Sequence, residues 1–586
     1  MSKTDIKVRE LVDKVQRGEL ALPEMQRRYV WPATRVRDLL DSLYRGYPSG
    51  TILAWETDEN VQDRQLAVKP TQGPTTSQKL LLLDGQQRIT SLTAILTGQP
   101  VYVRKRKKPI EILFNLDHPD GPPVNSSEIQ EIVEPIDSEE NDAELEDNDE
   151  DELIERGIQE EIRNRTFVVA NSALQNNPVW VPVSRVFEKS DKEILKPLHI
   201  NSDDERWDKY SARLQRLRQI AEYPYVMQVL EKNLSYEEVA DIFVRVNSLG
   251  MKLRGSDLAL AQISPRWNGF VELIEEFAHS FRDTEEYLLD TGLLIRALVV
   301  FATKQSRFKT IERVSHERAK LEEAWKSTQM GIEYARNFVL SNVGVDNFDH
   351  ISSSFLLIPI AVYWVLKEGK SITPDEERKL LRWFYIAHMR GHYTLGSSET
   401  ILDQDLSVLF GGRGLDGLLE QLRLQVKKIE VDSEDLKDRG IRSPFFSMLY
   451  FVLKQKGAKD WWSGLKLSEQ HTGKSHIIQC HHIFPRALLR KNQFDKKEIN
   501  DIANLAFIGG KTNRRISDKE PAQYFEQDII PSRGKEALES QLIPMDKRLW
   551  KVENYKEFLE RRRDATAVAI NEFMNQMAPS SMSITA

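Results

Sequence analysis

A cluster of histidines near the end of the chain carries the residue types best suited to chemistry. Four of the eleven histidines, His471, His476, His481 and His482, fall within twelve positions, and the last two are adjacent. Adjacent residues on a β-strand point to opposite sides, so one imidazole can hold a metal ion while its neighbour faces an attacking water. A neutral imidazole can accept a proton from water near pH 7, and a divalent cation can stabilise charge on a phosphate. The pattern therefore predicts a nuclease centre.

Two further elements follow the histidine pair. The segment Cys480–Pro485 reads CHHIFP, Ala503–Phe507 reads ANLAF, and Lys511–Arg514 reads KTNR. A His-His-x-x-Pro turn, an Asn-Leu pair at the start of a strand and an asparagine nine positions later resemble the motif of the HNH, or ββα-metal, nucleases. The region 470–530 also resembles the DUF1524 branch of these enzymes.

The resemblance implies a role for each residue of this motif. His481 and Asn513 would bind the metal ion, His482 would be the general base, and Asn504 would orient His482 through its backbone or amide. An oxygen-rich ligand sphere favours Mg²⁺ or Mn²⁺ over Zn²⁺, and the third histidine of many HNH sites has no counterpart here. The alternatives are a histidine-rich structural zinc site and histidines buried in a core. A single cysteine, Cys480, excludes a zinc ribbon built on cysteines.

A second histidine pair, His388 and His392, has the i, i+4 spacing of a helix. No glutamate follows His388, as the zinc protease motif requires, and Gly391 interrupts the helix between the two histidines. We therefore expect a structural role for this pair rather than a metal site.

The segment Leu83–Thr90, which reads LDGQQRIT, lies where a strand is expected to end and a helix to begin. Exposed amides at the start of a helix favour phosphate. Arg88 could add a bidentate donor to that phosphate, and Asp84 could coordinate a cation or position a water. The alternative is a plain Asp-Gly turn with a capping side chain.

Three other segments indicate a family for this turn. Leu22–Trp31, Tyr47–Gly50 and Phe243–Ser248 occur with Asp84–Arg88 in the order of DUF262 domains, over residues 10–265. Such domains resemble the ParB and sulfiredoxin fold, and the resemblance implies binding and hydrolysis of a nucleoside triphosphate. The same matching assigns the nucleotide site to Gln26, Arg27, Asp84, Gln86, Gln87 and Arg88.

DUF262 followed by DUF1524 in one chain is similar to the fused GmrSD-type restriction enzymes of type IV, including those associated with BREX phage-defence islands. The resemblance implies an endonuclease that cleaves double-stranded phage DNA with hydroxymethylated or glucosylated cytosines. It also implies two cofactors, a divalent metal and a nucleoside triphosphate. A homodimer would pair two cleavage centres, and symmetric dimers are the commonest assemblies. The alternative is a phage-defence sensor that binds nucleic acid through a degenerate HNH fold without cleaving it.

Hydrophobic periodicity predicts the elements that position these residues. Strands are expected at Thr51–Trp55, Lys79–Leu83, Ile242–Val246, His476–Phe484 and Leu505–Ile508. Helices are expected from Thr34 to Gly46, from the Asp84-Gly85 turn to Gly98, from Ser256 or Asp257 through Ile263, and after Tyr555. We therefore expect Asp257 to cap a helix in preference to binding a nucleotide. The apolar run Phe355–Leu366 is too short to cross a bilayer and predicts a buried helix.

These elements predict a multidomain α+β protein. Residues 1–265 would form the DUF262-like, ParB/sulfiredoxin-like α/β domain, residues 266–470 a mostly helical middle, and residues 471–586 the DUF1524-like ββα-metal (HNH) nuclease. A chain of 586 residues is too long for one hydrophobic core, which supports several domains. An acidic insertion at 137–161 is expected to be disordered or loosely helical.

Charge is unevenly distributed along the chain. The net charge is −8, but the insertion 137–161 alone contributes −13, so the remaining residues carry +5. Basic clusters that could neutralise DNA phosphates lie at Arg104–Lys108, at Arg486, Arg490 and Lys491, at Lys511, Arg514 and Arg515, and at Arg561–Arg563. One cysteine and the lack of a secretory signal lead us to expect a cytoplasmic protein without a membrane partner.

Overall fold

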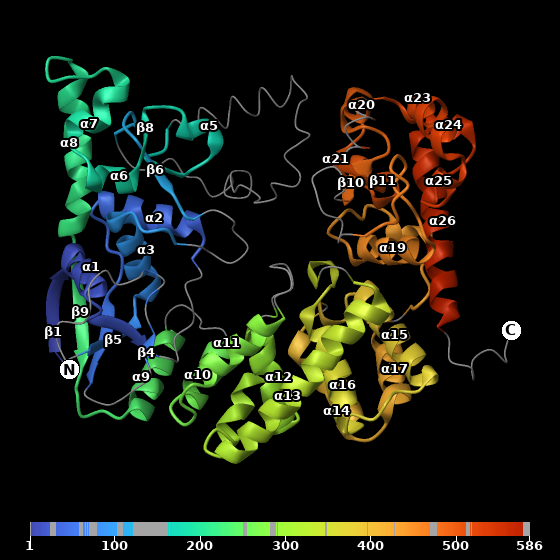
Figure 1. Ribbon diagram of the computed structural model, residues 1–586, viewed down its shortest axis with the longest axis horizontal. Helices are drawn as coiled ribbons and strands as arrows, with labels where there is room; N and C mark the ends of the chain where they lie inside the picture. The colour runs from blue at the N-terminus through green and yellow to red at the C-terminus, as the bar shows by residue number, and fades with distance from the viewer. Residues whose placement is uncertain are drawn as a thin grey trace. The chain divides into compact units, whose positions relative to one another are not determined.

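The computed structural model describes residues 2–23, 31–57, 63–64, 66, 68, 79–101, 109–120, 162, 164–249, 255–281, 289, 291–345, 348–394, 396–426, 428–468, 478–510, 512, 516 and 519–577. The chain separates into two compact units, Met1–Val271 and Glu272–Ala586 (Figure 1). The acidic insertion 137–161 and the basic cluster Arg104–Lys108 lie outside the described residues. Helices and strands occur together, in agreement with the predicted α+β class.

Unit 1 contains two sheets and the helices that cover them. Its strands are β1 (Ser2–Lys7), β2 (Leu20–Pro23), β3 (Ile52–Thr57), β4 (Asp63–Arg64), β5 (Lys79–Asp84), β6 (Ile112–Asn115), β7 (Phe167–Val169), β8 (Trp180–Pro182) and β9 (Pro224–Leu230). Its helices are α1 (Val8–Gln16), α2 (Ala33–Tyr44), α3 (Gln86–Thr97), α5 (Ser172–Gln175), α6 (Val183–Glu188), α7 (Asp191–Leu195), α8 (Arg206–Arg218), α9 (Tyr236–Leu249) and α10 (Gly255–Ile263).

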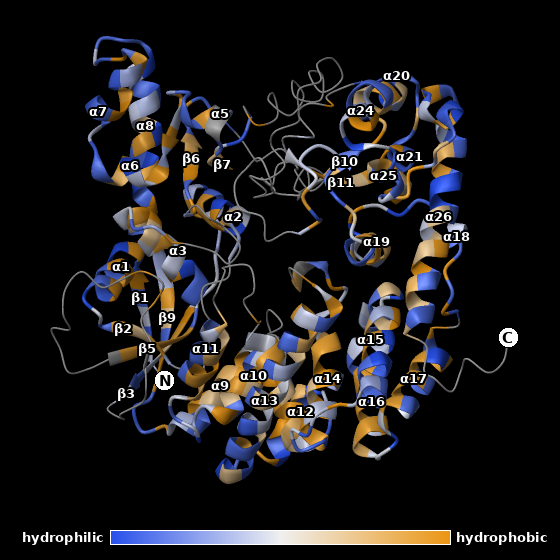
Figure 2. Cartoon of the chain, turned by 45° about the vertical axis from the view of Figure 1, so that its right-hand side comes forward, coloured by the Kyte–Doolittle hydropathy of each residue, from blue (hydrophilic) through white to orange (hydrophobic). Residues whose placement is uncertain are grey.

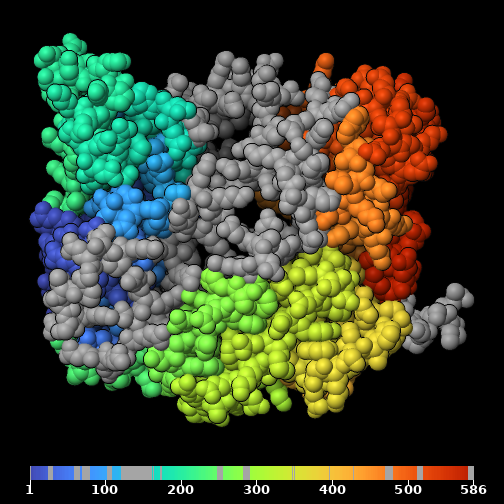
Figure 3. Space-filling view, in the orientation of Figure 1, coloured from blue at the N-terminus to red at the C-terminus, as the bar shows by residue number. Residues whose placement is uncertain are grey.

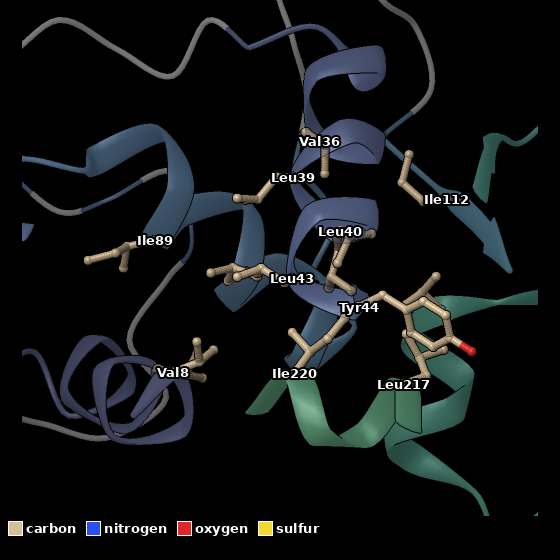
Figure 4. Close-up of a cluster of buried hydrophobic side chains, with 14 of the residues drawn as sticks. Val8, Val36, Leu39, Leu40, Leu43, Tyr44, Ile89, Ile112, Leu217 and Ile220 are labelled. Atoms are coloured by element: carbon tan, nitrogen blue, oxygen red, sulfur yellow. The ribbon is translucent and has the colours of Figure 1, made fainter. Parts of the chain in front are cut away.

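The larger sheet has the strand order β1-β9-β3-β5-β2-β4 and mixes parallel with antiparallel pairs. Successive residues of β5 point to opposite faces. Leu82 joins a core formed with α1, α2, α3 and α8, whereas Leu81 and Leu83 join a second core with Trp55 and Phe243. Side chains from these helices meet in the first core, as Figure 4 shows. Because both faces are covered, the apolar run of β5 is continuous.

The smaller sheet has the antiparallel order β7-β6-β8. With α5, α6, α7 and α8 it forms a lobe at one end of unit 1 (Figures 1 and 3). Helix α8 also packs Leu214 and Leu217 into the core shared with α2. The lobe is therefore continuous with the main sheet through α8.

Several predicted elements of unit 1 are confirmed. The strands expected at Thr51–Trp55 and Lys79–Leu83 are β3 and β5, and the helix expected to end at Gly98 is α3. Gly98 has a φ of 68°, the left-handed conformation in which glycine commonly ends a helix. The cap expected at Thr34 is wrong, because α2 begins at Ala33 with Pro32 at the N-cap position.

The strand predicted at Ile242–Val246 is also wrong, since these residues belong to helix α9. The side chain of Glu238 accepts hydrogen bonds from the amide and hydroxyl of Ser235, and the Glu238 amide bonds back to that hydroxyl. This capping box starts a helix. Val239 and Phe243, four positions apart, are buried on one face of it. The cap and the helical spacing outweigh the strand preference of the β-branched residues.

Unit 2 begins with helices and ends with a small hairpin and further helices. Its long helices are α12 (Thr291–Thr303), α13 (Arg318–Phe338), α14 (Leu357–Leu366), α15 (Pro374–Met389), α16 (Ser398–Phe410), α17 (Gly414–Gln425), α19 (Pro444–Gln455) and α26 (Tyr555–Gln576). The hairpin strands are β10 (Ile478–His482) and β11 (Leu505–Gly509). Short helices are α18 (Ser433–Leu436), α20 (Arg486–Lys491), α21 (Lys496–Ile499), α23 (Pro521–Tyr524), α24 (Ile530–Arg533) and α25 (Glu536–Glu539), and α11 (Phe270–Ser280) crosses the boundary between the units.

The helical middle and the closing helix predicted after Tyr555 are both present. Hydrophobic residues run along α12 and α14 (Figure 2), and α14 is the buried helix expected within Phe355–Leu366. Arg382 of α15 donates a 2.7 Å hydrogen bond to the carbonyl oxygen of Met574 in α26. Such contacts explain why the helical residues and the C-terminal residues share one compact unit. Across the described ranges, no helix combines the length and apolarity that crossing a bilayer requires.

Candidate functional site

The β10–β11 hairpin brings together three of the four residues predicted for the nuclease centre. The strands are antiparallel, with His482 opposite Leu505. Asn504 lies immediately before β11, and its carbonyl oxygen accepts a 2.7 Å hydrogen bond from the Ile483 amide. The fourth predicted residue, Asn513, lies outside the described residues.

His482 lies partly exposed at the end of β10, and Asn500 holds its imidazole. The Nε2 atom lies 3.1 Å from Asn500 Oδ1, so Nε2 donates its proton to this oxygen while Nδ1 keeps a lone pair. Burial and, to a lesser extent, Arg486 lower the pKa of His482, the Asn500 bond opposes them, and the net pKa is about 4. Near pH 7 the imidazole is therefore neutral, and Nδ1 can accept a proton.

Asn504 holds the backbone around His482, whereas the side-chain bond to the imidazole comes from Asn500. The Asn504 amide is buried. Its Oδ1 accepts a 2.8 Å bond from the Phe484 amide, and its Nδ2 donates to the carbonyl oxygens of Phe484 and Ile499 at 3.2 and 3.0 Å. Asn504 thus joins the turn after His482 to the end of α21, next to Asn500, and is a positioning residue.

Sequence motifs do not mark Asn500. The nearest local signal is the capping box of Asp495 and Glu498, which marks the start of α21; in the structure Asn500 is the residue that ends this helix. The pairing of Asn500 with an imidazole eighteen positions earlier depends on how the hairpin folds back.

Arg562, from α26, holds the turn that precedes β11. Its Nη1 donates to the carbonyl oxygens of Ala503 and Leu505 at 2.8 and 2.7 Å, and its Nη2 to that of Gln541 at 3.0 Å. Burial lowers the pKa of Arg562 to about 10, so it is charged near pH 7. The prediction that the cluster Arg561–Arg563 neutralises DNA phosphates is wrong for Arg562, because its guanidinium is fully buried against main-chain oxygens.

His481 lies on the side of β10 opposite to His482 and is buried. Its ring is nearly perpendicular to those of Trp461 and Tyr524, with centroid distances of 6.5 and 6.4 Å. The described part of the chain contains no group of three or more His, Cys, Asp or Glu side chains that could hold a metal ion. An ion at His481 would depend on amide and water oxygens, a ligand set that suits Mg²⁺ and Mn²⁺, and Asn513 fits that chemistry.

Asp460 is a buried carboxylate that contacts the last residue of β11, and no sequence motif marks it. Its Oδ1 accepts a 2.6 Å bond from the Gly509 amide, and its Oδ2 accepts bonds from the Thr512 hydroxyl at 2.9 Å and the Ser463 amide at 2.6 Å. Burial opposes ionisation of Asp460, but these hydrogen bonds outweigh it and lower the pKa. Asp460 therefore holds the segment that follows β11, including Thr512, the residue before Asn513.

The second histidine pair belongs to the helical core of unit 2. His388 is fully buried, and its Nδ1 accepts a 3.0 Å bond from the Ser352 amide. His392 Nε2 lies 2.8 Å from Asp405 Oδ2, which also accepts a bond from the Tyr393 hydroxyl at 2.6 Å. The two imidazoles take separate partners and hold the core together.

The β5–α3 turn of unit 1 leaves the start of α3 without a capping side chain. Gly85, between Asp84 and Gln86, has a φ of 97°, and a Cβ there would lie 2.6 Å from Ile52 Cδ1. Only glycine fits this turn. Gly85 has no side chain to cap the first amides of α3, and the first turn contains no acidic residue. The alternative, an Asp-Gly turn with a capping side chain, is therefore wrong. Uncapped amides at the start of a helix favour phosphate.

The guanidinium of Arg88 binds the chain itself. Its Nη1 donates to the Ser49 carbonyl oxygen at 2.6 Å, and its Nη2 donates to the Thr51 carbonyl oxygen at 2.8 Å and to Asp84 Oδ2 at 3.2 Å. Gly50 passes so close that a Cβ there would lie 2.3 Å from Nη1. Arg88 therefore positions this loop against the β5–α3 turn, which differs from the phosphate donor expected from the sequence.

Gln87 joins a third segment to the same turn. Its Oε1 accepts a 3.1 Å bond from the amide of Trp31. Gln86 is buried, whereas the Asp84 side chain is 42% exposed. The Asp84 side chain is therefore accessible from the surface, whereas that of Gln86 is not.

The other residues of the N-terminal motifs are distributed differently. Gln26 and Arg27 lie outside the described residues, a few positions before Trp31. Phe243 is buried in the core on the second face of the sheet. Asp257 is buried in the first turn of α10, which begins at Gly255, so the cap expected at Ser256 or Asp257 is wrong.

Comparison with known proteins gives two findings. Residues 8–264 match the family described as GmrSD restriction endonuclease, N-terminal domain. This range nearly coincides with unit 1 and confirms the predicted GmrSD-type N-terminal domain. An uncharacterized protein of Methanocaldococcus jannaschii is 22% identical over 578 residues, a match that covers 92% of this chain and 90% of the relative. Because the match is longer than either unit, the relative is similar to both units together.

Proposed function

We propose that this protein is a metal-dependent DNA endonuclease of the HNH type, with His482 as the general base. The observation that carries the proposal is the imidazole at the end of β10, whose Nε2 is held by Asn500 while Nδ1 keeps a lone pair. The restriction-endonuclease domain matched at residues 8–264 supports DNA as the substrate.

In the proposed mechanism, His482 Nδ1 takes a proton from the attacking water. The bond from Nε2 to Asn500 keeps the ring oriented and stabilises the charge that the ring gains. Asn504 keeps the strand end and the end of α21 in place. A divalent cation, Mg²⁺ or Mn²⁺, bound by His481 and Asn513 would stabilise charge on the phosphate and on the leaving 3′ oxygen.

We further propose that unit 1 binds a nucleoside triphosphate at the β5–α3 turn. The start of α3 suits a phosphate, and the exposed carboxylate of Asp84 suits a cation that accompanies it. Arg88 holds the loop before β3 against this turn. By resemblance to the ParB/sulfiredoxin-like DUF262 domains, the remaining site residues are Gln26, Arg27, Gln86 and Gln87.

The substrate that we propose is double-stranded phage DNA with hydroxymethylated or glucosylated cytosines, cut in the cytoplasm by type IV restriction. The resemblance to fused DUF262 and DUF1524 proteins supports this substrate. A nuclease inside its host must be restrained, so the nucleotide would bind the cutting-competent arrangement more tightly than the resting one. A homodimer would supply two cleavage centres for the two strands.

A cleavage assay with defined duplexes tests the proposal. Wild-type protein would be incubated with glucosylated, hydroxymethylated and plain DNA, with and without a divalent metal and a nucleoside triphosphate. We expect cleavage of modified DNA only when both cofactors are present. His482→Ala should be slower by about 10²- to 10⁴-fold, because it removes the general base. His316→Ala, which changes a histidine with a 65% exposed side chain, should cut like the wild type.

A second variant separates the base from its support. Asn500→Ala keeps His482 but removes one hydrogen bond, worth about 0.5–1.5 kcal/mol, so cleavage should fall only about 2- to 10-fold. Wild-type cleavage by His482→Ala would reject His482 as the base. DNA binding without cleavage under every condition would instead favour the sensor.

A further inference from the structure

A basic hollow in unit 1 shares no residue with either candidate site. It encloses about 320 Å³ between the end of α2, the residues after β6 and one side of α8. Figure 4 shows the Tyr44 ring beside α8, with its hydroxyl directed away from the hydrophobic cluster. The polar lining consists of Tyr44, His118, Asp120, Lys209, Arg213 and Arg216.

Helix α8 supplies all three cations of the hollow. Lys209, Arg213 and Arg216 are four and three positions apart, a spacing that places them on one side of a helix. The lining becomes more buried with depth, since the side chains of Asp120 and Lys209 are 92% and 50% exposed, whereas that of Arg213 is 9% exposed. The hollow is therefore open at a rim and basic at its floor.

Contacts with the chain hold the two arginines in place. Arg213 Nη1 donates to the Leu116 carbonyl oxygen at 2.6 Å, and its Nη2 donates to Asp120 at 3.1 Å. Arg216 Nε donates to the Tyr44 carbonyl oxygen at 3.1 Å, and its guanidinium lies 4.6 Å from the centre of the Tyr44 ring. A guanidinium has five N–H donors, so these bonds orient each arginine and leave further donors for a ligand. Because these arginine side chains are already ordered, binding a ligand costs little additional side-chain entropy.

The charges of the lining select the kind of ligand. Three cations face one lining carboxylate, Asp120, and Asp117 bonds Lys209 from beside the hollow at 3.0 Å. Among the described residues, one unit of positive charge remains. The His118 Nε2 lies 3.0 Å from the Tyr44 hydroxyl, and burial lowers the pKa of this histidine, so it adds no charge near pH 7. A ligand with a single negative charge, such as a phosphodiester, matches this balance better than a free phosphate dianion.

We infer that this hollow is a second DNA contact, which binds a backbone phosphodiester through Lys209, Arg213 and Arg216. The inference rests on the proposed function only in taking DNA as the substrate. A polymer can lie across the open rim while one phosphate reaches the arginines. A free phosphate could use the same donors, and the experiment separates the two sources.

The experiment measures DNA binding without cleavage. A full-length His482→Ala chain would bind a fluorescent, unmodified 30-base-pair duplex over a range of KCl concentrations. Lys209→Gln with Arg216→Gln, added to this background, should reduce the slope of log K against log[salt] by about 1, because one phosphate contact is lost. Arg185→Gln with Lys192→Gln removes the same charge from exposed residues outside the hollow and should leave the slope unchanged. Arg213 is left intact because it is nearly buried.

A variant that should strengthen DNA binding controls for misfolding. Asp120→Asn removes the lining carboxylate and should strengthen DNA binding at low salt, which damage to the fold would not do. Equal salt slopes for the Lys209/Arg216 variant and its control would overturn the inference. Loss of inorganic phosphate binding by that variant, with an unchanged DNA slope, would overturn the assignment to DNA. Failure of the parent chain to bind DNA at all would overturn the proposed function as well.

Discussion

Arg88 and Arg562 both donate hydrogen bonds to main-chain carbonyl oxygens, one in each unit. Arg88 bonds the loop before β3 from the first turn of α3, and its side chain is 13% exposed. Arg562 bonds the turn before β11 from the closing helix, and it is fully buried. The same side chain thus holds main-chain segments near the protein surface in one unit and from within a core in the other.

The side chain that each candidate site presents differs, and this difference separates the two sites. Arg88 also contacts Asp84, a carboxylate that is 42% exposed, whereas the hairpin held by Arg562 presents the imidazole of His482. Partly exposed ion pairs contribute little to stability, while buried carbonyl oxygens that lose a donor are costly. Under the proposed function, the N-terminal turn would therefore exchange partners with a ligand, and the hairpin would keep one geometry for proton transfer.

The largest expected effect is the loss of the buried arginine. Arg562→Met leaves the carbonyl oxygens of Ala503, Leu505 and Gln541 without this donor, at about 1–3 kcal/mol each, so we expect about 3–9 kcal/mol less stability for the hairpin. Hydrogen exchange of the β10 and β11 amides measures this loss. Arg561→Met, one position earlier on an exposed side chain, should change protection by less than about 0.5 kcal/mol. Similar protection in both variants would contradict the role of Arg562.

A smaller effect is expected at the N-terminal turn. Gly50→Ala and Gly46→Ala both place a side chain at positive φ, which costs about 1–2 kcal/mol. Only the Cβ at position 50 meets Arg88, at 2.3 Å, whereas nothing lies within 4 Å of one at position 46. We expect Gly50→Ala to lose about 1–3 kcal/mol more, measured by denaturant unfolding. Equal losses would show that the Arg88 contact does not support the loop.

The smallest effect on stability is expected for Asp84→Asn. Its pair with Arg88 is partly exposed, so unfolding should change by less than about 0.5 kcal/mol. Affinity for a fluorescent nucleoside triphosphate should fall about tenfold or more, because the carboxylate proposed to bind the accompanying cation is lost. Asp41→Asn removes a carboxylate from a similar i, i+4 pair with Arg45 and should leave nucleotide affinity unchanged. A stability loss without any change in affinity would make Asp84 a structural residue.

Short-range patterns were sufficient for most elements of both sites. The apolar run ending in Asp84-Gly85 predicts β5 and its turn, and Gly98 predicts the end of α3. The strands expected at His476–Phe484 and Leu505–Ile508 correspond to β10 and β11. The wrong strand at Ile242–Val246 also has a local explanation, since the Ser235–Glu238 capping box marks a helix start.

The sequence by itself determined which side chains could do chemistry and which strands and turns carry them, because caps, turns and periodicity depend on near neighbours. Only the tertiary structure decided what supports those side chains. Asn500 meets His482 across 18 positions, Asp460 meets Gly509 across 49, and Arg562 meets Leu505 across 57. A buried polar group must find a partner, but which partner it finds depends on the segments that folding brings together.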